Sequence, residues 1–275
     1  MIHKVDILLA TYNGEKYLEA QLESLLLQTY KDFKIIVHDD NSTDNTVKII
    51  REYTQDYPDK FIFIDDTISY ANASANFNFL LTQSHAEYIM FCDQDDVWLA
   101  QKVERSIKVI KTLESQHPST ATMVFSDLEV VDENLKVLAK SMWSQQKLNP
   151  HISQNLDDLL ALNVVSGCTM MFNKHCHKFI SPIPHHDITH DHWVAVNIAR
   201  YGYISFIKEA LIQYRQHPDN TIGAQSQGVQ YFFFKIIHLF KTPTKFFKKY
   251  SYFNFPINLQ KVFFNKLILN FKRLF

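Results

Sequence analysis

Five apolar residues lead directly into three carboxylates in the stretch Tyr88-Ile89-Met90-Phe91-Cys92-Asp93-Gln94-Asp95-Asp96-Val97-Trp98. An uninterrupted apolar run of this length is typical of a buried strand. Carboxylate oxygens at the end of such a strand are the ligands that hard divalent cations prefer. The stretch therefore predicts a strand that ends in a metal site, with a polar turn and one helix-capping aspartate as the alternative.

Strand-like and helix-like segments alternate upstream of this stretch. Apolar runs predict buried strands at residues 5–10, 34–38 and 61–64, before the strand at 88–92. Leucines at positions 18, 22, 25 and 26 have the spacing of a helix that lies on a sheet, and further helices are expected after an N-cap at Thr43 or Asp44 and at residues 76–84. Because parallel strands need crossover connections that are usually helical, the alternation predicts an α/β fold with a parallel sheet and helices on both faces.

Polar residues follow three of these strands. Thr11, Tyr12 and Asn13 follow the first strand, Asp39 and Asp40 the second, and the acids at 93–96 the fourth. Ligands of parallel sheets bind outside the carboxyl ends of the strands, so we expect one site at this rim. The five glycines form neither GxGxxG nor a P-loop, which leaves a metal rather than a glycine-rich backbone to hold phosphates. A calcium-binding EF-hand is disfavoured because Trp98 occupies the position of the required glycine.

The second half of the chain alternates less regularly. We expect a helix at 102–113, a strand at 123–126, a hairpin at 128–137, a helix at 156–162 and a strand at 164–172, in which Gly167 marks a close approach of backbone or ligand. A strand pair is expected at 203–207 and 211–215. This half is predicted to contact an acceptor rather than a nucleotide.

Four histidines and two aspartates lie within residues 185–192. His186 and His190 have the i, i+4 spacing of helical zinc ligands, but the segment has no HExxH pattern. The simpler interpretation is a polar loop in which Asp191 caps a helix that runs to Arg200. The functional interpretation is that Asp191 is a general base at the helix start. His217, just beyond a predicted strand, is either structural or a metal ligand that reaches back to the rim.

Composition limits the class of protein. The chain has 275 residues, 46% of them hydrophobic, which fits one large domain or a domain with an appendage. A formal net charge of -1 gives no global field that would recruit nucleic acid. Three cysteines without a CxxC pair argue against a disulfide framework, and neither a signal peptide nor an apolar run of about 18 residues is present. We therefore expect a cytoplasmic protein.

The C-terminal part has a different composition. No Asp or Glu follows Asp219, and twelve of the 22 phenylalanines lie from residue 229 onward among lysines. Basic amphipathic segments of this kind bind at membrane interfaces, with rings among the headgroups and ammonium groups near anionic lipid. Residues 229–275 are thus predicted to contact a membrane surface. The alternatives are a helical cap over the core and a contact in a homo-dimer.

Together, these motifs resemble the inverting family 2 glycosyltransferases of the GT-A fold, whose sheet is Rossmann-like and mostly parallel. The resemblance rests on residues 10–14, 37–44 and 92–98, in the order and spacing of that family. Residues 167–169, 190–193 and 214–217 look like its rhamnosyltransferase-like branch from bacterial surface polysaccharide synthesis. The resemblance implies a GT-A domain over residues 1–223, with a nucleotide-binding half at 1–127 and an acceptor half at 128–223. Residues 224–275 would form a basic, membrane-associating helical extension.

The resemblance also implies roles for individual residues. The nucleotide would contact a set from the strand ends, with Asp40 accepting from the imide N–H of the base: Ala10, Thr11, Tyr12, Asn13, Asp40 and Asp93. Mg²⁺ or Mn²⁺ would be held by Asp95 directly, by Asp93 partly through waters, and by His217. Asp191 falls where the family keeps its catalytic base. The donor and acceptor sugars would contact Asp96, Trp98, Gly167 and Trp193.

The activity implied is transfer of one sugar at a time with inversion, since the QxxRW motif and membrane spans of the processive synthases are absent. The branch favours dTDP-L-rhamnose as the nucleotide-diphosphate sugar and a lipid-linked saccharide as the acceptor, at the inner face of the plasma membrane. UDP-hexoses remain open, because Asp40 would read uracil and thymine alike. A metal-dependent nucleotidyltransferase or phosphohydrolase, and a non-catalytic scaffold, are the alternatives from other classes.

Overall fold

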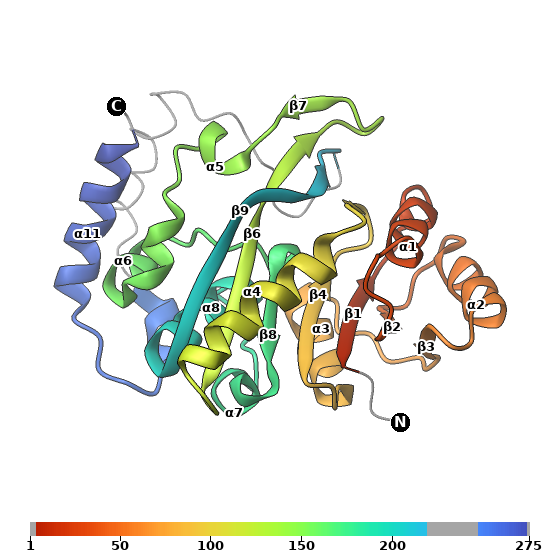
Figure 1. The fold of residues 1–275 in the computed structure, drawn as a ribbon, viewed down its shortest axis with the longest axis horizontal. Helices are drawn as coiled ribbons and strands as arrows, with labels where there is room; N and C mark the ends of the chain where they lie inside the picture. Colours follow the sequence, from red (N-terminus) through yellow and green to blue (C-terminus); the bar gives the residue numbers. More distant parts are fainter. Residues whose placement is uncertain (1–3, 219–246, 274–275) are drawn as a thin grey trace.

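The computed structural model describes residues 4–218 and 247–273. These residues form a nine-stranded sheet in the order β3-β2-β1-β4-β8-β6-β9-β5, with β7 paired to β6 (Figure 1). The strands β1 to β4 run parallel, as predicted, and β6 and β9 form a second parallel pair. The strand bounds are β1 (Val5–Thr11), β2 (Phe33–Asp39), β3 (Phe61–Ile64), β4 (Tyr88–Cys92), β5 (Val97–Trp98), β6 (Ala121–Val131), β7 (Val137–Ala139), β8 (Met170–Asn173) and β9 (Gly202–Arg215).

Helices cover both faces of the sheet, which confirms the predicted fold class. In Figure 1, α4 crosses in front of β6 and β9, and α8 lies behind the same strands. The helices are α1 (Leu18–Leu26), α2 (Thr46–Asp56), α3 (Ala73–Gln83), α4 (Lys102–Gln116), α5 (Met142–Gln145), α6 (Leu156–Ala161), α7 (His177–Ile180), α8 (His190–Tyr201) and α11 (Leu259–Lys272). Short 3₁₀ turns are η1 (Pro150–Gln154), η2 (Gly167–Thr169), η3 (Lys174–Cys176) and η4 (Lys249–Tyr252).

Three local predictions were wrong. The strand expected at 164–172 begins only at Met170, because residues 167–169 form a 3₁₀ turn closed by a hydrogen bond from Thr169 N to Ser166 O of 3.0 Å. The strand pair expected at 203–207 and 211–215 is one continuous strand, β9, which pairs with β6 through a register shift at Asp127. Residues 208–210 offer no turn residue, so the bulge absorbs the irregularity without a reversal. The N-cap of α2 is Asn45 rather than Thr43 or Asp44.

The described C-terminal residues pack against the domain. Helix α11 lies on α6, where Asn265 Nδ2 donates to Asp158 Oδ1 at 2.9 Å. Ahead of it, the hydroxyl of Tyr250 donates to Leu160 O at 2.8 Å. One face of this extension thus caps the core, while residues 219–246 and 274–275, which include the predicted domain boundary at 223, lie outside the described residues. No helix in the described ranges is long and apolar enough to cross a membrane.

Candidate functional site

The ends of β1 and β2 are joined by hydrogen bonds between their polar residues. The hydroxyl of Thr11 donates to Asp39 Oδ1 at 2.8 Å, and Ser42 N donates to Asp39 Oδ2 at 2.7 Å. Asp40 N donates to Thr11 O at 2.8 Å, and the buried Asp40 carboxylate accepts from Tyr70 N. The structure therefore places Thr11 and Asp40, both predicted to bind the nucleotide, side by side on adjacent strand ends.

The loop after β1 is clamped to the loop after β4. Tyr12 N donates to Gln94 Oε1 and Gln94 Nε2 donates to Tyr12 O, each at 2.8 Å. An added Cβ at Gly14 would lie 2.3 Å from Gln94 Oε1, so a larger residue there would displace the Gln94 amide from this clamp. Tyr12 keeps 57% of its surface exposed, Asn13 adopts a positive φ of 46°, and Ala10 is half-buried within β1. The exposed tyrosine ring is available to a ligand beside the acidic residues.

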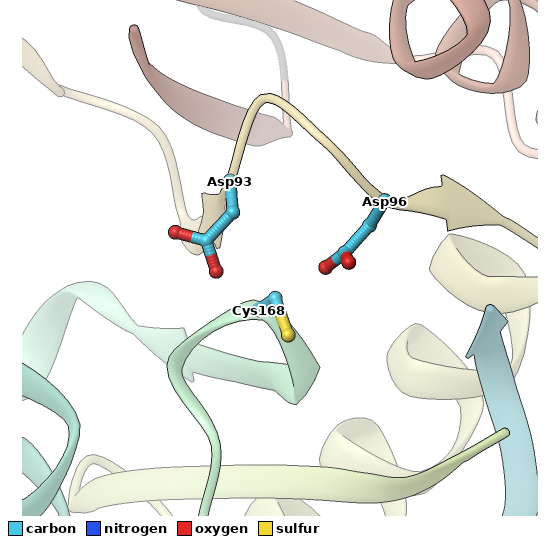
Figure 2. Close-up of side chains that lie close together, drawn as sticks. All are labelled: Asp93, Asp96 and Cys168. Atoms are coloured by element: carbon cyan, nitrogen blue, oxygen red, sulfur yellow. The ribbon is translucent and has the colours of Figure 1, made fainter. Parts of the chain in front are cut away.

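The residues Asp93 to Asp96 form a turn, here called the acidic turn, between β4 and β5. Figure 2 shows Asp93 and Asp96 pointing toward Cys168 of η2, and one ligand atom from each of the three lies within 4.8 Å of the others. Asp96 is fully buried; its Oδ1 accepts from Arg215 N at 3.1 Å, whereas Oδ2 has no hydrogen-bond partner in the described part of the chain. The sequence analysis assigned no site role to Cys168, although it predicted a close approach of backbone or ligand at the adjacent residue, Gly167.

Burial and mutual repulsion favour the protonated forms of these acids. Burial, together with the charges of Asp95 and Asp191, raises the pKa of Asp93 to about 7. Burial and the charges of Asp95 and Asp93 raise the pKa of Asp96 well above its ordinary range. A divalent cation would reverse both effects, because it offsets crowded negative charge and accepts the unpartnered oxygen as a ligand. The donor set, rich in carboxylate oxygen, fits the Mg²⁺ or Mn²⁺ expected from the sequence.

Asp95 lies against His217, the third predicted metal ligand. His217 Nε2 is 2.9 Å from Asp95 Oδ2, across 122 positions of sequence. The structure thus joins two members of the predicted metal set directly. The remaining member of the predicted metal set, Asp93, groups with Asp96 and Cys168, so the acidic turn presents carboxylates in two directions.

Asp191 lies in the first turn of α8. Its carboxylate accepts from His192 N at 2.6 Å and from the hydroxyl of Thr189. Thr189 is the N-cap residue, so the interpretation of Asp191 as the cap was wrong. The charge of Asp191 contributes to the raised pKa of Asp93, so the predicted base acts electrostatically on the acidic turn.

The histidine-rich segment before α8 does not form the zinc site considered from sequence. His190 instead packs between the rings of Phe77 and Phe91, at centroid distances of 4.6 and 5.5 Å. A Cβ on Gly167 would lie 2.4 Å from His190 Nε2, which explains the glycine by packing. Among the described residues, neither His190 nor His186 joins a group able to hold a metal.

Both tryptophans predicted to line sugar pockets are largely buried. Trp98 is 2% exposed, and Lys102 Nζ lies 3.2 Å from its ring centre. Burial lowers the pKa of Lys102 to about 7, and no sequence pattern predicts that this lysine is buried. Trp193 stacks on Phe253 at 4.8 Å and donates from Nε1 to Ile180 O at 2.7 Å. Their sugar contacts remain predictions.

Comparisons with known proteins identify the family of the chain. The sequence model of the family described as "Glycosyl transferase family 2" matches residues 6–179. The chain is 29% identical over 227 residues to a protein of Shigella flexneri named dTDP-rhamnosyl transferase RfbG, covering 78% of this chain and 74% of that protein. It is 27% identical over 227 residues to an uncharacterized glycosyltransferase of Nostoc, covering 79% of this chain and 66% of that protein.

Two solved structures share the fold. The mannosyltransferase PcManGT of Pyrobaculum calidifontis, in complex with GDP-Man and Mn²⁺, matches with a TM-score of 0.62 at 15% identity, covering 100% of this chain and 72% of that one. TarS of S. aureus, in complex with UDP, matches with a TM-score of 0.56 at 20% identity, covering 78% of this chain and 61% of that one.

Proposed function

The chain belongs to glycosyl transferase family 2 and has the GT-A type of fold, and from that premise we propose that it transfers a single L-rhamnose from dTDP-rhamnose to a lipid-linked saccharide. The observation on which the proposal rests is the group formed by Asp93, Asp96 and Cys168 at the strand ends, because the charge of Asp191 at the start of α8 adds to the raised pKa of Asp93. A base at a helix start and a cluster of carboxylates at the strand ends supply the two functions that sugar transfer needs.

In the proposed reaction, Asp191 accepts the proton of an acceptor hydroxyl as that oxygen attacks the anomeric carbon. The hydrogen bonds from His192 N and Thr189 fix the carboxylate at the start of α8. Attack from the face opposite the leaving diphosphate inverts the anomeric centre in one displacement. A divalent cation held by Asp93, Asp95 and His217 would neutralise the leaving diphosphate when bound.

Replacement of Asp191 by Asn tests the proposed base. Asn keeps an oxygen that accepts from His192 N, so α8 should begin as before, but it cannot take a proton. We expect transfer to fall at least 100-fold, on the order of the contribution of a general base, with donor affinity nearly unchanged. The matched control is Asp157→Asn, also in the first turn of a helix, where transfer should stay near normal. Near-normal transfer by Asp191→Asn would refute the assignment.

The donor is proposed from the relative named as a dTDP-rhamnosyl transferase. Asp40 supports a thymine or uracil nucleotide equally, so the two donor classes must be separated by experiment. Wild-type protein should release nucleoside diphosphate from dTDP-rhamnose, in the presence of a lipid-linked saccharide, at least tenfold faster than from any UDP-hexose. A preference for a UDP-hexose would replace rhamnose while leaving transfer intact. Release of diphosphate or monophosphate without an acceptor would instead indicate a phosphohydrolase or nucleotidyltransferase.

We also propose that the outer face of α11 binds anionic membrane. Phe264, Ile268 and Phe271 recur at helical spacing on this face and are each more than half exposed, at 61%, 52% and 58%. Exposed Lys272 flanks them, and no acidic residue occurs after Asp219. Rings that enter the interface beside lysines suit anionic headgroups, and this would bring the enzyme to a lipid-linked acceptor.

Vesicle sedimentation tests the membrane proposal. Wild-type protein should pellet with vesicles of anionic lipid and much less with neutral ones, and the double change Phe264→Ser with Phe271→Ser should abolish pelleting. Leu138→Ser, at a 55% exposed leucine of β7, is the control and should pellet like wild type. Equal pelleting by wild type and the double variant would exclude this face as the membrane-binding surface. If the protein instead self-associates and the double variant does not, the result would favour the homo-dimer.

A further inference from the structure

Arg215, the last residue of β9, lies at the centre of the contacts around the acidic turn. Its side chain is almost completely buried, with 4% of the residue exposed. Nε donates to the backbone oxygen of Asp95 at 2.7 Å, and its backbone N donates to Asp96 Oδ1 at 3.1 Å. Nη1 donates to the backbone oxygen of Glu133, in the turn between β6 and β7, at 2.6 Å. One guanidinium group thus joins two segments that are far apart in sequence.

The same aromatic ring supports Arg215 and His217. The Arg215 guanidinium carbon lies 4.6 Å from the ring centre of Tyr17, and the ring centre of His217 lies 4.6 Å from the same ring. His217 is two residues after Arg215 and reaches the Asp95 carboxylate at 2.9 Å. Asp95 is therefore fixed twice from the end of β9: its backbone by the guanidinium and its carboxylate by the imidazole.

From these contacts we infer that Arg215 is a positioning residue for the metal-binding pair Asp95 and His217. Its fork of N–H groups fixes the carbonyl of Asp95 relative to the end of β9, and this sets where the carboxylate and the imidazole meet. Lysine cannot replace it, because a single ammonium group lacks the planar fork that spans two carbonyl oxygens. The inference rests on the proposed metal-dependent function, and it adds a residue to which that function assigns no role.

The test measures Mn²⁺ binding by titration calorimetry in the presence of dTDP, with transfer kinetics alongside. Arg215→Lys retains the buried charge but loses the fork. We expect it to weaken Mn²⁺ binding at least tenfold, the usual loss when a group that orients a metal ligand is removed, and to raise the Mn²⁺ concentration needed for half-maximal transfer equally. Arg51→Met is the control, because this exposed arginine of α2 also uses two guanidinium N–H groups, which donate to the Asp65 carboxylate at 3.0 and 2.9 Å. It should leave Mn²⁺ binding unchanged.

A double-mutant cycle separates positioning from general stability. If Arg215 acts through His217, then Arg215→Lys should cost little further Mn²⁺ affinity once His217→Ala is present. Additive losses, or an Arg215→Lys protein that melts earlier yet binds Mn²⁺ like wild type, would overturn the inference. Wild-type protein that binds no Mn²⁺ would overturn both this inference and the proposed metal role. If wild type and Arg215→Lys both bind Mn²⁺ with the same affinity, only the inference about Arg215 is overturned.

Discussion

Replacement of Asp93 by Asn should stabilise the metal-free protein at alkaline pH. Burial and the charges of Asp95 and Asp191 raise the pKa of Asp93 from 3.8 to about 7. A carboxyl group whose pKa is higher in the folded than in the unfolded chain favours folding only while it is protonated. Its contribution is complete below pH 3.8 and is lost as the pH rises through about 7. Ionised Asp93 therefore lowers the stability of the metal-free protein at neutral and alkaline pH.

The size of this effect follows from the same values. One pKa unit corresponds to about 1.4 kcal/mol, so a rise from 3.8 to about 7 destabilises the metal-free protein at pH 8 by at most about 4 kcal/mol. Movement of the turn or entry of water would reduce the figure. Since a folded domain is stable by about 5–15 kcal/mol, even half of this effect is measurable. Asn has no charge to lose, so its variant should show most of that difference as added stability at pH 8.

Urea unfolding in EDTA, followed by circular dichroism at pH 5 and pH 8, measures the effect. Wild type should lose stability between these values through Asp93, whereas Asp93→Asn should lose less and exceed wild type at pH 8. Asp59→Asn, at an exposed position between α2 and β3, is the control and should follow wild type. Mn²⁺ at pH 8 should stabilise wild type more than Asp93→Asn, because binding to the folded state stabilises by mass action. Identical pH dependence in wild type and Asp93→Asn would refute the reasoning.

Three further predictions concern packing, buried charge and metal. Gly167→Ala should lower the free energy of unfolding by about 1–3 kcal/mol in a urea titration, because its Cβ would lie 2.4 Å from His190 Nε2. Adding His190→Ala to the Gly167→Ala protein should recover part of that loss. Lys102→Met should leave the free energy of unfolding at pH 6 unchanged or raise it by up to about 4 kcal/mol, because the change replaces a buried charge by an apolar chain of similar volume. A clear decrease in the free energy of unfolding would contradict this prediction. Transfer should disappear in EDTA and return with excess Mn²⁺, and activity undiminished by chelation would exclude the metal.

The strands were predictable where local pattern and tertiary burial agree. β3 and β4 have the predicted bounds, because each apolar run is followed directly by acidic residues. β9 was predicted as two strands because residues 208–210 in its middle are exposed or only half-buried, at the point where the register with β6 shifts. Such a bulge depends on the partner strand, and the sequence of β9 alone does not contain that information.

The site was predictable as a set of strand ends but not as a set of contacts. Residues of the acidic turn, His217 and Asp191 could be named because they follow strands or begin a helix. Cys168 and Arg215 fall within motifs of the resemblance but were given no role, and Lys102 was not singled out, since their contacts depend on pairing between distant segments. Arg215 Nε meets Asp95 across 120 positions. A buried lysine in particular has no sequence signature, because lysines at helix starts are ordinarily exposed.

The unpartnered oxygen of Asp96 favours a metal site over a polar turn as the interpretation of the acidic turn. In a polar turn whose aspartate only caps a helix, each carboxylate oxygen would accept from a backbone N–H at the helix start or from water. Asp96 is instead fully buried and groups with Asp93 and Cys168, and its Oδ2 has no hydrogen-bond partner among the described residues. A cation held in part by Asp93 would offset the crowded negative charge of both Asp93 and Asp96. The destabilisation expected at pH 8 therefore tests the Asp93 side of the acidic turn, and the Mn²⁺ affinity that Arg215 is inferred to maintain tests the side of Asp95 and His217.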